Sequence, residues 1–255
     1  MNTDVFTGVM IPFFGTALGA GLVFFMKREF NFSLEDFLSA LAGGVMTAAA
    51  IWSLIIPATE SCESMGAFAF LPCSIGMAFG CIFMIILGRI ADSQVGAQGD
   101  IIRSDNHNTI LAVTIHNIPE GMAVGCVYAS AVESGNDKLF AAAFILALGI
   151  AVQNIPEGAV ISMPVYASGK TRVKAFLAGT ASGVVEPLGA LSALFMAEAI
   201  GVLLPYFLGF AAGAMLFVVT QELLPNVKYK GKFPLTGVGF LLGFMIMMCL
   251  DVSLA

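Results

Sequence analysis

Apolar residues in this chain fall in long blocks rather than in short runs that alternate with polar positions. A block of about 20 apolar residues is long enough to cross a bilayer as one helix. We therefore predict eight membrane-spanning helices, over Val5–Met26, Phe37–Pro57, Phe68–Ile90, Thr109–Ala131, Leu139–Val165, Arg172–Glu198, Val202–Leu224 and Phe233–Leu250. They form one membrane domain, residues 1–255, with a single longer connection at residues 92–108 that is expected to be a variable, mobile loop.

Composition agrees with this pattern. Apolar residues make up 58% of the chain and charged residues only 11%, and the mean hydropathy is +0.93. A soluble domain carries about 25% charged residues, so this chain has too few to cover itself with a charged surface. A water-soluble enzyme is excluded, and the predicted fold class is an all-α integral membrane protein within a lipid bilayer. The chain has no cluster of basic residues that would suggest nucleic acid as a partner.

Lysine and arginine predict the orientation of the chain in the membrane. With eight spans, all but one of the 11 basic residues fall on the same side, and the exception is Lys138. Loops rich in lysine and arginine face the cytoplasm. The connections between helices 1 and 2, 3 and 4, 5 and 6, and 7 and 8 are therefore predicted to be cytoplasmic. Both termini are predicted to lie outside, in a protein of the cell membrane.

Glycines four residues apart recur along the spans. In lipid, such pairs let two helix backbones approach closely, so they predict helix packing, and the faces they create would also permit a homodimer. The pairs are Gly15 and Gly19, Gly76 and Gly80, Gly121 and Gly125, Gly179 and Gly183, Gly209 and Gly213, and Gly239 and Gly243.

The fourth and fifth predicted helices carry the same polar phrase. Residues 115–121 read Ile-His-Asn-Ile-Pro-Glu-Gly, and residues 153–158 read Gln-Asn-Ile-Pro-Glu-Gly. Positions three and four residues apart share one face of a helix, so the polar side chains of each phrase lie together. An ionisable side chain in the middle of a span costs about 2.5–3.5 kcal/mol and indicates function by default. The proline of each phrase also frees a backbone carbonyl four residues earlier.

Two such faces turned toward each other would combine one imidazole, two carboxylates and three amides. Glu186, followed by Pro187 in the sixth helix, adds a third carboxylate. Mixed nitrogen and oxygen ligands suit zinc, with iron, manganese, cobalt or cadmium as further candidates. The predicted metal-ligating residues are His116, Asn117, Glu120, Gln153, Asn154, Glu157 and Glu186.

These motifs resemble those of the ZIP (Zrt-/Irt-like) family of divalent-metal transporters, and Gln153 resembles the GufA-like subgroup. The resemblance covers the whole chain and implies transport of zinc, iron, manganese or cadmium into the cytoplasm, with these ions as substrates. It implies a binuclear site. One metal would be held by His116, Glu120, Gln153 and Glu157, and the other by Asn117, Glu120, Asn154, Glu157 and Glu186. Many members have histidine where this chain has Gln153, and some have aspartate where it has Asn154.

Other interpretations remain open from the residues themselves. A membrane-embedded metal-dependent hydrolase is the alternative function, but the chain has no His-Glu-x-x-His motif and only two histidines, so we do not expect an enzyme. A polar network that only fixes helix packing is the structural alternative. Near the helix ends, Glu60 and Glu222 either guide cations or simply face water. Asp251 is expected to be interfacial, and His107 to have no ligand role.

Overall fold

The computed structural model describes residues 3–26, 32–95, 101–195, 197–224 and 235–254, and these are almost entirely helical. The first half contains α1 (Thr3–Gly21), η1 (Leu22–Phe24), α2 (Phe32–Ala49), η2 (Ala50–Ile55), α3 (Ile56–Glu60), η3 (Glu63–Phe68) and α4 (Phe70–Val95). The second half contains α5 (Ile101–Ser134), α6 (Asp137–Ala167), α7 (Arg172–Ser182), α8 (Val185–Phe195), α9 (Ala197–Val218), η4 (Val219–Leu223) and α10 (Leu235–Leu254).

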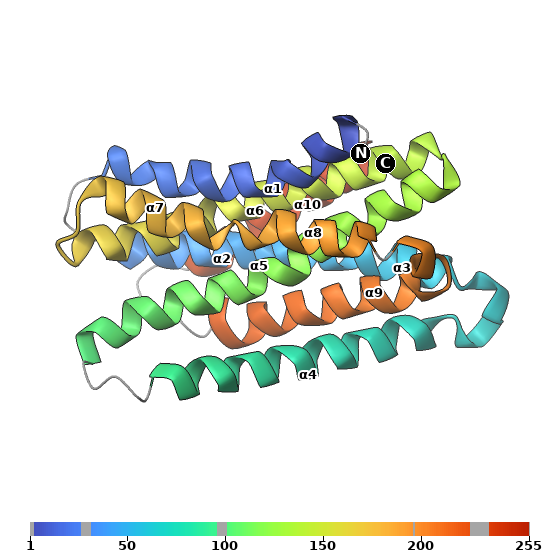
Figure 1. Ribbon diagram of the computed structural model, residues 1–255, viewed down its shortest axis with the longest axis horizontal. Helices are drawn as coiled ribbons and strands as arrows, with labels where there is room; N and C mark the ends of the chain where they lie inside the picture. Colours follow the sequence, from blue (N-terminus) through green and yellow to red (C-terminus); the bar gives the residue numbers. More distant parts are fainter. Residues whose placement is uncertain (1–2, 27–31, 96–100, 196, 225–234, 255) are drawn as a thin grey trace.

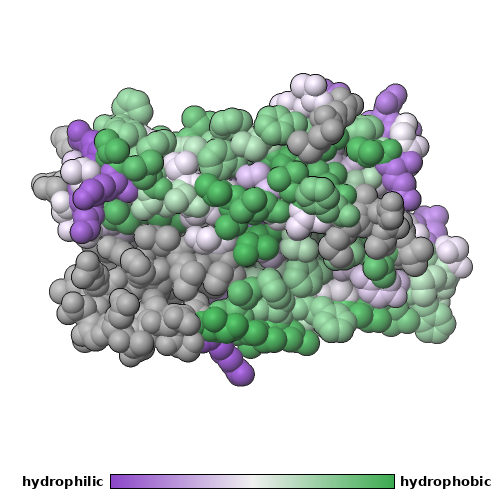
Figure 2. All heavy atoms as spheres, in the orientation of Figure 1, coloured by the Kyte–Doolittle hydropathy of each residue, from purple (hydrophilic) through white to green (hydrophobic). Residues whose placement is uncertain are grey.

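The helices run side by side as one elongated bundle (Figure 1). The N- and C-termini lie at one end, and α1, α4 and α6 all end at the opposite one. Hydrophobic residues cover the middle of the face in Figure 2, and hydrophilic residues gather toward the ends. Exposed side chains on the bundle include Phe79 and Leu241. A soluble protein would bury such a surface, so this distribution fits a bundle solvated by lipid.

Seven helical segments in the described part of the chain are long and apolar enough to cross a membrane. They are Thr3–Phe24, Asp36–Glu60, Phe70–Ile90, Asp137–Ala167, Arg172–Phe195, Leu203–Gln221 and Leu235–Ser253. Each coincides with one of the expected spans. The eighth expected span, Thr109–Ala131, lies within α5, and the side chains of most of its first part lie outside the described residues. The total of eight spans therefore stays a prediction.

Glycines bring the helices into contact in four main pairs: α1 with α6, α2 with α10, α4 with α9, and α5 with α8. Gly15 and Gly19 of α1 lie directly against the backbone of α6, and Gly76 and Gly80 of α4 against that of α9. A Cβ atom at any of these positions would overlap a backbone carbonyl of the neighbour. Because only hydrogen leaves room for this approach, the predicted packing role of the glycine pairs is confirmed at these positions.

Two expectations about helix boundaries were wrong. The loop expected at residues 92–108 is shorter, because α4 continues to Val95 and α5 already begins at Ile101. Hydropathy marks only the part of a helix that lies in lipid, and a helix can continue beyond it into water. The expected single helix Arg172–Glu198 is broken, since α7 ends at Ser182 and α8 begins at Val185.

Candidate metal centre

Six of the predicted ligands lie together inside the bundle, and we call them the polar cluster. They are Asn117 and Glu120 from α5, Gln153, Asn154 and Glu157 from α6, and Glu186 from the first turn of α8. Five of them are completely buried and Glu157 is only 5% exposed. Polar groups this deep are costly unless they have partners or a ligand. The side chain of the seventh predicted ligand, His116, lies outside the described residues.

Glycine and proline together place these side chains on neighbouring helices. Pro119 and Pro156 lie inside α5 and α6, and both helices continue through them. Gly121 follows Glu120 by one residue and lies against the backbone of Glu186 at the start of α8. Gly158 follows Glu157 in the same way and lies against the backbone of Thr16 in α1. Each phrase therefore supplies a carboxylate and, directly after it, the surface that receives a neighbouring backbone.

The break between α7 and α8 positions Glu186. In a regular helix the carbonyl of Gly183 would accept from the N–H of residue 187, but Pro187 has no N–H. This carbonyl accepts from the Glu186 N–H instead, at 3.1 Å. The Asn117 amide nitrogen donates to the carbonyl oxygen of Ser182, also at 3.1 Å. A backbone group released inside a membrane must be satisfied within the protein, and Asn117 does this across two helices.

Glu186 is held by donors from two further directions. The Thr16 hydroxyl of α1 donates to Glu186 Oε1 at 2.6 Å, and the Asn117 amide donates to the same oxygen at 3.1 Å. Glu186 also interacts with the Asn154 side chain, whose amide nitrogen donates to the carbonyl of Pro12 at 3.4 Å. Thr16 was not among the predicted site residues. A threonine in an apolar helix carries no charge, so only its position between two packing glycines could have drawn attention to it.

The two repeated phrases contact each other directly. The Gln153 amide nitrogen donates to Glu120 Oε1 in a short hydrogen bond between α6 and α5. Glu120 also lies within electrostatic range of Glu157 and Glu186. Three carboxylates so close together in a medium of low dielectric constant repel strongly when charged. Protons or cations must therefore balance them.

Several oxygens of the polar cluster are left without a hydrogen-bond donor among the described residues. One oxygen atom of each of five buried side chains is in this position: Asn117 Oδ1, Glu120 Oε2, Gln153 Oε1, Asn154 Oδ1 and Glu186 Oε2. Buried side-chain acceptors in folded proteins nearly always have a partner, so five together require an explanation. A cation satisfies oxygen acceptors of this kind, and amide and carboxylate oxygens are suitable ligands.

The side chains are not gathered around one point as a finished coordination shell. In the described part of the chain, no three histidine, cysteine, aspartate or glutamate side chains come together closely enough to hold an ion. Two of the carboxylates accept hydrogen bonds from amides instead, Glu120 from Gln153 and Glu186 from Asn117. Binding of a cation by two carboxylates would therefore require these side chains to exchange partners.

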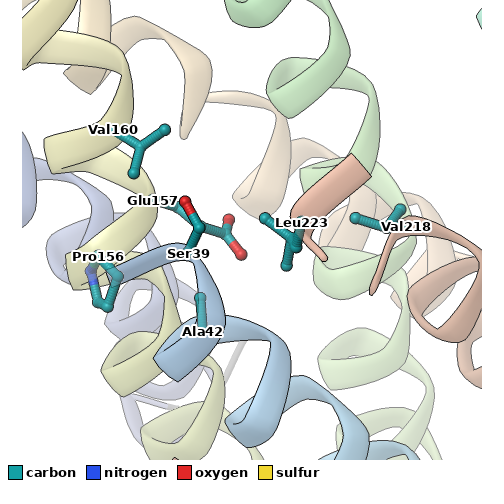
Figure 3. A pocket seen from close by; sticks show the side chains of 7 residues that line it. All are labelled: Ser39, Ala42, Pro156, Glu157, Val160, Val218 and Leu223. Carbon is teal, nitrogen blue, oxygen red and sulfur yellow. The ribbon is translucent and has the colours of Figure 1, made fainter. Parts of the chain in front are cut away.

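A small cavity adjoins the polar cluster beside Glu157. Its volume is about 20 Å³, and its walls come from α2, α6, α9 and η4 (Figure 3). The lining residues are Ser39, Ala42, Pro156, Glu157, Val160, Val218 and Leu223. A cavity of this size has room for about one water molecule. Ser39 and Glu157 are its polar residues, and no motif in the sequence singles out Ser39.

The polar residues expected near the helix ends differ in exposure. Glu60 is exposed at the end of α3, and Gln221 is exposed in η4. The side chains of Glu222 and His107 lie outside the described residues. Asp251 is only 8% exposed, and its carboxylate accepts from the Ser53 hydroxyl at 2.7 Å, so the side chain packs inside the bundle, and its position at the membrane interface stays a prediction. Ser53 belongs to the π-helical turn η2, which sequence patterns do not reveal.

Comparison with known proteins places the chain in a family. The ZIP Zinc transporter family matches residues 91–251, which include the polar cluster. The human protein "Zinc transporter ZIP11" is 31% identical, with 99% of this chain and 98% of the relative aligned. "Zinc transporter ZIPB" of Bordetella bronchiseptica is 33% identical over 95% of this chain and 78% of its own length. "Zinc transporter GufA" of Myxococcus xanthus is 31% identical over 94% of this chain and 95% of its own length.

These relatives are named as transporters, which removes the hydrolase alternative and agrees with a chain that is not an enzyme. The apolar helices and the family together indicate a multi-pass membrane protein that transports metal. The chain belongs to the ZIP family of zinc transporters and falls within its GufA-like subgroup.

Proposed function

We propose that this protein carries zinc across the cell membrane into the cytoplasm, with iron, manganese and cadmium as further substrates. The observation that carries the proposal is the set of five buried oxygens without a donor in the polar cluster. They lie between helices in an apolar bundle, where a permanently empty set of acceptors would be destabilising. The names of the relatives support zinc as the substrate.

The polar cluster is proposed as the transport site, with room for two metal ions that share Glu120 and Glu157. His116, Glu120, Gln153 and Glu157 would hold one ion, and Asn117, Glu120, Asn154, Glu157 and Glu186 the other. In the absence of metal, the Gln153 amide donates a hydrogen bond to Glu120 and the Asn117 amide donates one to Glu186. An arriving cation replaces these hydrogen-bond donors. When the cation leaves, the carboxylates again accept hydrogen bonds from the amides and bind protons. The weak neutral ligands allow release, which a carrier requires.

The orientation proposed is the one with both termini outside and the basic connections in the cytoplasm. Metal would then enter from the end of the bundle that carries the termini. It would leave toward the end where α1, α4 and α6 finish (Figure 1). A homodimer is also proposed, since exposed apolar faces such as that of Leu241 on α10 can pack against a second copy in lipid.

Uptake of radiolabelled zinc by cells expressing the protein tests the proposal. Glu120→Gln removes the charge of a buried carboxylate in α5 and should abolish most of the flux. Glu133→Gln makes the same change at an exposed position of the same helix and should transport like the wild type. Expression of each variant at the membrane is measured in parallel. Equal flux in all three proteins would contradict the site, and absence of flux in the wild type would contradict the function.

A second arm of the same assay addresses the metal and the direction. Unlabelled cadmium, iron and manganese are added as competitors, and a true substrate should lower zinc uptake through the wild type. Cells preloaded with labelled zinc measure export, which should be much slower than uptake at the same gradient. Faster export than uptake would contradict the proposed direction.

A further inference from the structure

The cavity between α2 and α6 adjoins the polar cluster at Glu157 and adds Ser39, which does not belong to that cluster. Ser39 projects into it from α2 and Glu157 from α6, and the two side chains lie together in Figure 3. Val218 and Leu223, from α9 and η4, close the cavity on the other side. The remaining lining side chains are apolar, so the hydroxyl and the carboxylate are the groups that can bind a polar occupant.

Ser39 differs from Thr47 and Ser182, whose hydroxyls are bonded within their own helices. Thr47, on the same helix, donates to the carbonyl of Gly43 at 2.7 Å, and the buried Ser182 donates to the carbonyl of Gly179, also at 2.7 Å. No hydrogen bond of the Ser39 hydroxyl is found among the described residues, although the side chain is only 8% exposed. The side chain lines the cavity, so an occupant of the cavity would supply the hydrogen bond or the ligand contact that the described residues do not.

The position of the cavity suggests what the occupant is. Ser39 lies near the start of α2, and Glu157 lies in the second half of α6, before the turn that carries Lys170. Leu223 ends η4. These parts of α2, α6 and η4 adjoin the basic connections that the positive-inside rule assigns to the cytoplasm. The cavity therefore lies between the polar cluster and the cytoplasmic end of the bundle.

We propose that Ser39 and Glu157 form a second cation-binding station, through which a divalent metal ion passes after it leaves the polar cluster. This inference rests on the proposed transport function and adds α2 to the helices that contact the metal. One carboxylate oxygen and one neutral hydroxyl oxygen bind a cation more weakly than the polar cluster does. The cavity, of about 20 Å³, has room for about one water-sized occupant, so the ion must shed most of its hydration.

The size of the cavity gives the station a selectivity. Mg²⁺ loses its water reluctantly and keeps several water ligands when it binds to proteins. Zn²⁺ is satisfied by four ligands, and the Ser39 hydroxyl and the Glu157 carboxylate supply part of this set. The station therefore passes zinc and holds back magnesium. Ser39 is in this way a residue that determines the specificity of release.

A thiol at position 39 tests the station directly, because cadmium bound to a thiolate gives an ultraviolet charge-transfer band. The full-length Ser39→Cys protein is purified in detergent and titrated with Cd²⁺, and the wild type supplies the baseline for the five native cysteines. Thr47→Cys places a thiol on the same helix away from the cavity and serves as the matched control. The expected result is one additional saturable Cd²⁺ band in Ser39→Cys that Thr47→Cys lacks.

The double variant Ser39→Cys with Glu157→Gln tests whether the two residues bind the ion together, and it should weaken Cd²⁺ binding at the new thiol at least tenfold. Equal spectra for Ser39→Cys and Thr47→Cys would overturn the inference. A band that Glu157→Gln leaves unchanged would overturn it as well. Because this readout needs no transport, a Cd²⁺ band in a protein that moves no metal would refute the proposed function and leave the station standing.

Transport by Ser39→Ala gives the second measurement. Loss of one oxygen ligand should lower the maximal zinc flux about threefold to tenfold, the range expected for one hydrogen-bond-like interaction. The KM for zinc should change less than twofold, because the polar cluster that receives the ion is intact. Thr47→Ala should behave like the wild type. A maximal flux of wild-type size in Ser39→Ala, with normal expression, would overturn the inference.

Discussion

Thr16→Val isolates the hydrogen bond that holds Glu186. The hydroxyl of Thr16 lies 2.6 Å from Glu186 Oε1, and both side chains are completely buried. Valine has nearly the same shape, so the contacts of the Thr16 side chain with Gly183 are kept. The Asn117 amide remains on the same carboxylate oxygen at 3.1 Å. The substitution therefore removes one of the two donors to Glu186 Oε1, together with a long 3.5 Å bond from the Thr16 hydroxyl to the Pro12 carbonyl.

The magnitude follows from these contacts. A hydrogen bond to a charged group contributes about 1.5–3 kcal/mol, and the remaining Asn117 donor places the loss at the lower end. Since about 1.4 kcal/mol corresponds to a factor of ten, the KM for zinc should rise about tenfold. Glu186 Oε2, the oxygen without a donor among the described residues, is the atom that would face the metal. Thr16 therefore acts as a positioning residue for a proposed ligand.

Initial rates of zinc uptake over a range of concentrations separate KM from the maximal rate. Thr16→Ser keeps the hydroxyl and should restore a KM close to that of the wild type. Thr47→Val is the control, because Thr47 donates only to the backbone of its own helix. A KM of wild-type size in Thr16→Val would refute the reasoning. An equal defect in Thr16→Ser and Thr16→Val would show that packing, rather than the hydroxyl, matters.

Three further predictions concern helix packing, metal affinity and the buried carboxylate of Asp251. Gly121→Ala forces a Cβ into the carbonyl of Glu186 and should lower the melting temperature and the flux, whereas Gly88→Ala meets nothing within 4 Å and should be tolerated. Gln153→His supplies a stronger nitrogen ligand and should lower the KM for zinc, and an unchanged KM would remove this residue from the site. Ser53→Ala leaves the buried Asp251 carboxylate without its donor and should lower the melting temperature by a few degrees, with an unchanged value counting against the pair.

The sequence by itself determined the class of the protein and most of the candidate site. Apolar blocks of about 20 residues have few stable arrangements other than helices in lipid, because every backbone group must then be satisfied within its own segment. Glycine spacing predicted close packing for the same local reason, and the contacts of Gly15 and Gly19 agree with it. The repeated phrase identified its polar residues because charge is rare and costly at membrane depth.

Tertiary structure alone decided which groups face each other. Thr16 and Glu186 are far apart in the chain, and neither the charge nor the spacing of Thr16 indicates that it donates to Glu186. Ser39 is a candidate cation ligand only because α2 places it in the same cavity as Glu157. The break before Val185 and the burial of Asp251 also depend on neighbouring helices. Helix periodicity is local and readable from the sequence, whereas the partner of a buried polar group is set by packing between helices, which no single segment encodes.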